Sequence, residues 1–147
     1  MRFMLLQYYA EPASGAPTMT EWTPDEVRAH IEFQHVLNAE LIERGEFVDA
    51  QGLTAPDQCK VVSVDENGAR VVTDGPYPET KELIAGYRMI DVETRDRALE
   101  IAAKAAAAPG PGGAPIRDRI EVREVLGAPG PEADSDAGMV EWLKENI

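Results

Sequence analysis

Few residues in this chain of 147 have chemistry that identifies a function at once. It has one cysteine and two histidines, and aromatic residues make up only 6% of it. Cys59 has no cysteine to pair with and no metal-ligand spacing around it, so we expect a small buried strand residue. Phosphate-binding loops, dinucleotide fingerprints, nucleophile elbows and zinc motifs are also missing, and we predict neither a cofactor nor a metal site.

Basic charge is scarce as well. The chain has 14 Lys and Arg residues against 27 Asp and Glu residues, a formal net charge of −13. A surface with this balance repels nucleic acid and anionic lipid, so neither is expected as a partner. No apolar run is long enough to span a membrane, and the first residues do not form a secretory signal, which predicts a cytoplasmic protein.

The hydrophobic pattern predicts one α+β domain over residues 1–126. Strands are expected at residues 2–9, 46–53, 59–64, 69–73, 83–92 and 120–125, with helices at 24–44 and 95–107. Asn67-Gly68 is a strong hairpin signal between the two middle strands. The expected order is therefore β-α-β-(hairpin)-β-α-β. Residues 127–147 read as an acidic Pro/Gly linker followed by a short amphipathic tail.

The first helix has clear boundaries and an unusual mixed face. Thr23, Pro24 and Glu26 form a capping box at its start, and Gly45 ends it. The expected buried face carries Val27, Ile31, Leu41 and Ile42. His30, Gln34 and Asn38 fall among or beside these positions at helical spacing, and His35 lies at the edge. Polar side chains on a packing face need hydrogen-bond partners.

The first strand and residues 83–92 are apolar on both faces. We expect one face to carry Phe3, Leu5, Leu83 and Met89 and the other to carry Met4, Leu6, Ile84 and Ile90. Two crossover helices can cover only one face of such a sheet. A second sheet must cover the other face, and an identical chain is the simplest source, so a homodimer is predicted.

A stiff, charged corner connects the hairpin to the next strand. Pro76 and Pro78 restrict the backbone there. Its candidate site residues are Asp74, Tyr77, Glu79, Lys81 and Glu82. Asp74 is explained equally well as a functional carboxylate or as a turn carboxylate that accepts from backbone N–H groups. Glu79 and Lys81 project to one side of an extended chain, either as an acid–base pair or as a solvated ion pair.

Arg88 interrupts an otherwise apolar row in a strand that should be buried. A buried guanidinium requires a partner, either a protein carboxylate such as Glu121 or Asp49, or an anionic ligand. Gly86 leaves room for a ligand or another chain beside it. We expect Tyr87 and Gln34 to line the same cleft.

The corner sequence Asp74-Gly75-Pro76-Tyr77, followed by Glu79-Thr80-Lys81-Glu82, resembles the Asp-Gly-Pro-Phe motif of YCII-related proteins, with Tyr77 in place of the usual phenylalanine. The resemblance extends to Met4-Leu5-Leu6, to residues 86–92 and to residues 120–123, and so covers residues 1–126. It implies a ferredoxin-like βαββαβ fold with an extra hairpin, pairing as a dimeric α/β barrel. Such proteins are often encoded beside extracytoplasmic-function sigma factors, which implies a regulatory link to a factor of that kind.

Two functions are consistent with these features. One is a small-molecule-binding or regulatory module whose cleft is lined by the corner, the first helix and the strand at 83–92. The other is an enzyme that uses Glu79, Lys81 or His35 for acid–base chemistry on a small organic substrate. The lack of a complete catalytic constellation favours the binding module.

Overall fold

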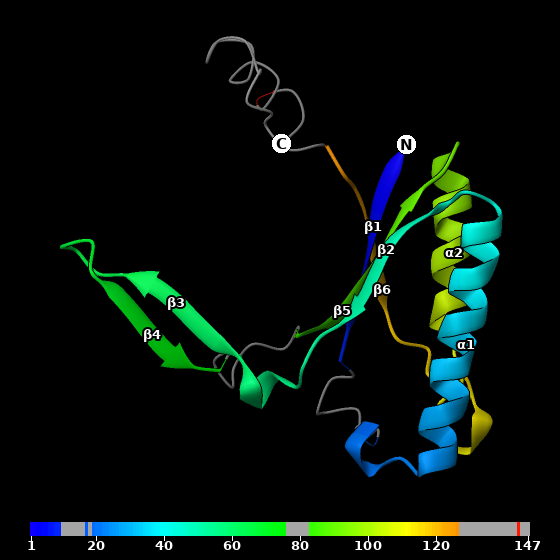
Figure 1. Cartoon of the computed structure of the whole chain (residues 1–147), viewed down its shortest axis with the longest axis horizontal. Coiled ribbons are helices and arrows are strands. Elements are labelled where there is room, and N and C mark those ends of the chain that lie inside the picture. The colour runs from blue at the N-terminus through cyan, green and yellow to red at the C-terminus, as the bar shows by residue number, and fades with distance from the viewer. Residues whose placement is uncertain (10–16, 18, 76–82, 127–143, 145–147) are drawn as a thin grey trace.

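The computed structural model describes residues 1–9, 17, 19–75, 83–126 and 144 of the chain. Two long helices lie side by side against a sheet, and a separate hairpin projects away from it (Figure 1). The described strands are β1 (Arg2–Tyr8), β2 (Phe47–Gly52), β3 (Lys60–Val64), β4 (Arg70–Asp74), β5 (Ile84–Asp91) and β6 (Ile120–Glu124). The α-helices are α1 (Pro24–Glu43) and α2 (Arg95–Ala106), and short 3₁₀ turns lie at η2 (Met19–Glu21), η3 (Pro56–Gln58) and η4 (Pro111–Gly113). The predicted order of elements is confirmed.

The main sheet has the strand order β2-β5-β1-β6, and each neighbouring pair is antiparallel. β1 and β2 run parallel on either side of β5, so α1 is the crossover between them, and α2 likewise connects β5 to β6. Both helices lie on the same side of the sheet (Figure 1). No helix in the described part of the chain covers the opposite side, which we call the open face.

α1 begins where the sequence predicts but buries a different face. Thr23 Oγ1 accepts from the Glu26 N–H at 3.3 Å and Glu26 Oε2 accepts from the Thr23 N–H at 2.8 Å, which confirms the capping box. The predicted apolar stripe is wrong in part, because Ile31 is 46% exposed and Ile42 is 60% exposed. The buried residues of α1 are His30, Leu37 and Leu41. This face joins Leu37 and Leu41 to the core, and its polar residues supply hydrogen-bond acceptors to an arginine on the sheet below.

The core lies between the helices and the covered face of the sheet. Its buried members are Phe3, Leu5, Leu37, Leu41, Ile90, Val92, Ala98, Ile101, Ala102 and Ala105. The alanine-rich stripe predicted for α2 is confirmed, since all four of its buried residues belong to that stripe. Small side chains there allow the helix backbone to approach the strands closely.

The register between β1 and β5 decides which side chains share a face. Phe3 lies opposite Ile90, and Met4 lies opposite Met89. The predicted grouping of Met89 with Phe3 was therefore wrong: Met89 belongs to the open face with Met4. Alternation assigns faces within one strand, but the phase between strands depends on their pairing. The open face is still apolar at its centre, where Met4, Leu6 and Met89 are half-buried.

The hairpin β3–β4 forms its turn as predicted, with Gly68 at a φ of +78° and its N–H donating to Asp65 O at 3.0 Å. It stands away from the main sheet (Figure 1), and its valines at 62, 64, 71 and 72 are exposed. Cys59 precedes β3 and is exposed. The prediction of a buried strand cysteine was wrong, because the core formed by the described residues does not extend to this hairpin.

Two predicted features lie outside the described residues. They are the corner at residues 76–82 and, apart from Lys144, the linker and tail at 127–147. Within the described part of the chain, no helix is long and apolar enough to cross a membrane.

Candidate functional site

Arg88 of β5 lies between α1 and the sheet and is only 3% exposed. Its Nε donates to Asn38 Oδ1 at 2.8 Å, and its Nη2 donates to Gln34 Oε1 at 2.8 Å. Both partners are neutral amides on the inner face of α1. The predicted alternative of a protein carboxylate at Asp49 or Glu121 was wrong, because these two residues belong to the open face while Arg88 points to the covered one.

The buried cation has no carboxylate partner among the described residues. Loss of hydration lowers the pKa of Arg88. Its second terminal nitrogen, Nη1, makes no hydrogen bond within the described chain. No fully buried side-chain nitrogen or oxygen there lacks a partner, so Nη1 is not fully enclosed. A positive charge is thus held inside the protein, and its Nη1 donors have no partner among the described residues.

The same helix face continues the polar cluster to His30. Gln34 Nε2 lies 3.3 Å from His30 Nε2, and His30 Nδ1 lies 3.0 Å from Pro109 O. The indole ring of Trp22 packs edge-on against the imidazole, with ring centroids 5.5 Å apart. The spacing of His30, Gln34 and Asn38 by four residues was the sequence signal for this cluster, because it puts all three on one side of a helix.

Asp118 completes the cluster, and the sequence analysis missed it. Burial raises the pKa of this half-buried carboxyl, and a positive charge on His30 lowers it whenever that ring is protonated. The preceding residue, Arg117, has a φ of +56°, a left-handed conformation that is uncommon outside glycine. Asp118 lies between two arginines in a loop, and nothing in that sequence indicates that its side chain is partly buried.

The strands beside Arg88 carry small residues on the covered face. Ala50 pairs with Arg88, and Gly52 pairs with Gly86. A Cβ at Gly52 meets no atom within 4 Å, whereas a Cβ at Gly86 lies 2.7 Å from Gln51 O. Gly86 was predicted to leave room for a ligand or another chain; its missing side chain accommodates the backbone of β2. The open space lies at Gly52.

Of the predicted corner, the structure describes only the first two residues, Asp74 and Gly75. Tyr77, Glu79, Lys81 and Glu82 lie outside the described residues. Asp74 ends β4 and forms an exposed ion pair with Lys60 across the hairpin. This ion pair supports neither of the two roles predicted for Asp74.

Tyr87 and His35 do not join the cluster. Tyr87 lies on the open face, where its hydroxyl donates to Asp49 Oδ2 at 2.6 Å. This bond lowers the pKa of Asp49 and raises that of Tyr87. On the next pair of strands, the Tyr8 hydroxyl donates to Glu121 Oε2 at 2.8 Å. His35 is exposed and lies roughly 100° around α1 from Gln34.

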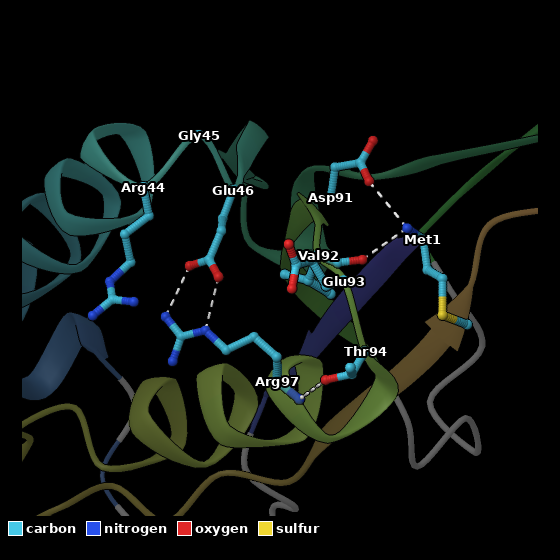
Figure 2. A pocket seen from close by; sticks show the side chains of 9 residues that line it. All are labelled: Met1, Arg44, Gly45, Glu46, Asp91, Val92, Glu93, Thr94 and Arg97. Atoms are coloured by element: carbon cyan, nitrogen blue, oxygen red, sulfur yellow. Dashed lines mark hydrogen bonds and ion pairs between the residues drawn. The ribbon is translucent and has the colours of Figure 1, made fainter.

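A depression of about 610 Å³ lies at the other end of the sheet, where α1 ends and α2 begins (Figure 2). The charged groups around it are largely paired with one another. Glu46 accepts two hydrogen bonds from Arg97, each 2.8 Å long, and the Met1 amino group donates to Val92 O at 2.7 Å and Asp91 Oδ1 at 3.3 Å. We interpret this region as a structural junction. No group of three or more potential metal ligands occurs in the described residues.

Comparison with models of known protein families shows to which family the chain belongs. Residues 1–117 match the YCII-related domain. The protein belongs to the YCII-related family. No curated protein matches the chain.

Most of the polar cluster lies within the YCII-related domain. The match spans β1 to α2 and the loop beyond, and so contains His30, Gln34, Asn38 and Arg88. Asp118 lies one residue past its end, and β6 also lies outside it. The cluster is therefore built largely from the domain itself, with one carboxylate from the connection to the last strand.

Proposed function

We propose that the protein is a dimeric, ferredoxin-like α/β-barrel protein that binds a small organic anion, with the charge of the ligand facing Arg88. The observation that carries this proposal is the guanidinium of a buried arginine, Arg88, whose partners in the described chain are neutral.

An unbalanced buried cation is costly unless something compensates it. Removing an ion from water costs several kcal/mol in a real protein, and neutral hydrogen bonds return only part of that, on the order of 1–3 kcal/mol each. A structural arginine in this position is expected to face a carboxylate. The Nη1 nitrogen, which has no hydrogen-bond partner among the described residues, and the open space at Gly52 are consistent with an anion supplied from solution.

The dimer is proposed from the open face. Half-buried apolar side chains run along its centre, from Met4 and Leu6 on β1 to Met89 on β5. A tyrosine–carboxylate pair lies on each side of this stripe. Sheets that pack face to face interdigitate such surfaces. A second copy of the chain supplies a face of the same shape and composition, as a two-fold interface requires.

The enzyme alternative finds less support. It relies on Glu79 and Lys81, which lie outside the described residues, and on His35, which is exposed on α1. Binding requires only the cluster around Arg88.

The first prediction tests this function by replacing the cation. Arg88→Met removes the charge, and no buried carboxylate of the described chain is abandoned. We expect the unfolding free energy of the ligand-free protein to change by no more than about 1–2 kcal/mol, since two hydrogen bonds are lost and the cost of burying an ion is removed. Thermal melting with acetate, benzoate and phosphate should show stabilisation of the wild type by at least one of these anions.

The variant should lose that stabilisation. Arg28→Met is the matched control, because the Arg28 side chain is 72% exposed on the outside of α1. It should respond to the anions as the wild type does. Equal anion stabilisation of Arg88→Met and the wild type contradicts the proposed site.

A further inference from the structure

The hydrogen bonds around Gln34 have only one possible direction. A guanidinium can donate but cannot accept, so the group of Gln34 that lies 2.8 Å from Arg88 Nη2 must be its carbonyl oxygen. The amide nitrogen of Gln34 then faces His30 Nε2, 3.3 Å away. That nitrogen is a donor, so His30 Nε2 must be an acceptor and must carry no proton.

The contact of the other ring nitrogen, Nδ1, leads to the same protonation state. His30 Nδ1 lies 3.0 Å from Pro109 O, and a carbonyl oxygen only accepts. Nδ1 therefore carries the proton, and the ring is the neutral Nδ1–H tautomer. The chain of donation runs from Arg88 to Gln34, from Gln34 to His30, and from His30 to the backbone.

Protonation of His30 is incompatible with this chain. A proton on Nε2 places two donors face to face, so the Gln34 amide must rotate to present its oxygen to His30. Its NH₂ group then faces Arg88, which has nothing to accept with. Gln34 can serve Arg88 or protonated His30, but not both at once.

An anion on Arg88 resolves the conflict, because it takes over the Nη2 donor that Gln34 Oε1 now accepts from. We propose that the site binds a small carboxylic acid as two parts, the carboxylate on Arg88 and a proton on His30 Nε2, with Gln34 rotating between them. This inference rests on the proposed anion site. The proton comes from solution, Nε2 gains one N–H bond, and no bond of the ligand changes.

The charged groups that face His30 suit this exchange. Arg88 faces it through Gln34 from β5, Asp118 faces it from the loop before β6, and Glu26 lies one turn earlier on α1. Glu26 Oε1 is occupied by the Gly112 N–H at 2.7 Å. Asp118 is half-buried and close enough for the charge of His30 to act on it, so it supplies the opposite charge when His30 is protonated.

The first experiment needs no ligand. Nitrogen-15 NMR of the full chain reports which nitrogen of His30 carries the proton and at what pH the second proton binds. We expect the Nδ1–H tautomer in the wild type and protonation at a higher pH in Arg88→Met.

Loss of the arginine charge alone also shifts protonation in this direction, so the shift is measured again in a Gln34→Leu background, where it should be clearly smaller. An Nε2–H tautomer, or an equal shift with and without Gln34, overturns the proposal.

The second experiment counts protons. Calorimetric titration with acetate and benzoate in two buffers of different ionisation enthalpy should show uptake of about one proton per anion bound where free His30 is neutral. Affinity should fall about tenfold per pH unit there, since a group protonated only in the complex favours binding at low pH. His30→Gln should remove the uptake, and His35→Gln should retain it.

The outcomes separate the two proposals. Anion binding without proton uptake, or uptake unchanged in His30→Gln, overturns the proton exchange and leaves the anion site standing. If neither anion binds at any pH, the anion site is wrong, and the proposed exchange is wrong with it.

Discussion

Gly86 and Gly52 lie opposite each other in the β2–β5 pairing, yet their missing side chains have different consequences. At Gly86 a Cβ lies 2.7 Å from Gln51 O and 3.2 Å from Gly52 Cα, both of them backbone atoms. A strand backbone cannot yield as a flexible side chain can. At Gly52 a Cβ meets nothing within 4 Å, so the same methyl group is accommodated there.

The second prediction follows from this contrast. Gly86→Ala should lower the unfolding free energy by about 1–3 kcal/mol, because the new methyl group pushes β2 away from β5. Gly52→Ala should lie within about 0.5 kcal/mol of the wild type. Urea denaturation monitored by circular dichroism measures both. Equal costs for the two variants contradict the close approach at Gly86.

At the scale of elements, one ion pair connects the end of α1 and the start of β2 to α2. Glu46 accepts from Arg97 Nε and Nη2, both at 2.8 Å, and the two side chains are 16% and 25% exposed. The hydrogen bonds from Arg97 hold the pKa of Glu46 below its usual range, and those to Glu46 raise the pKa of Arg97. Partial burial and two-pronged geometry distinguish this pair from ordinary surface ion pairs.

The third prediction concerns its pH dependence. Because the folded-state pKa of Glu46 is lowered, its contribution is fully present above the usual glutamate range, about pH 4–5, and is lost as pH falls through the lower folded-state pKa. Glu46→Gln should therefore cost about 1–2 kcal/mol at neutral pH, and the difference from the wild type should shrink in acid.

Glu100→Gln is the control for the same arginine. Glu100 also pairs with Arg97, but its side chain is 67% exposed, so its removal should have a much smaller effect. Urea denaturation of both variants across the acid range makes the comparison. A cost for Glu46→Gln that stays constant with pH is evidence against the ion pair as its source.

At the scale of the whole molecule, the two faces of the sheet give opposite expectations for the same kind of substitution. Leu5 is 1% exposed beneath the helices, and its neighbours along β1, Met4 and Leu6, lie half-buried on the open face. A charge on the covered face must be buried in the core of one chain. A charge on the open face is buried only if a second chain covers it.

The fourth prediction uses this difference to test the dimer. Met89→Lys, on the open face, should leave the chain folded and convert it from dimer to monomer. Leu5→Lys should cost more than about 3 kcal/mol and unfold the chain. Sedimentation gives the mass of each species, and circular dichroism reports whether it is folded. A folded wild-type monomer at micromolar concentration contradicts the dimer.

The sequence by itself determined the order of the elements, the capping box at Thr23, the hairpin turn at Gly68 and the alanine-rich buried stripe of α2. These depend on contacts between near neighbours in the chain, and periodicity and turn chemistry report such contacts directly. It also predicted that Arg88 is buried and that His30, Gln34 and Asn38 need partners, because an isolated polar residue stands out in an apolar row.

Only the tertiary structure decided which groups meet. Gln34 and Asn38 are 54 and 50 residues from Arg88 in the chain, and Asp118 approaches His30 from beyond α2. The rotation of α1 exposes Ile31 and buries His30 beside the core residues Leu37 and Leu41, so one face of the helix both joins the core and supplies partners to that arginine. Likewise, Met89 lies on the same face as Met4 because the two strands pair in that register. Register is a property of two paired strands and cannot be read from the sequence of one strand.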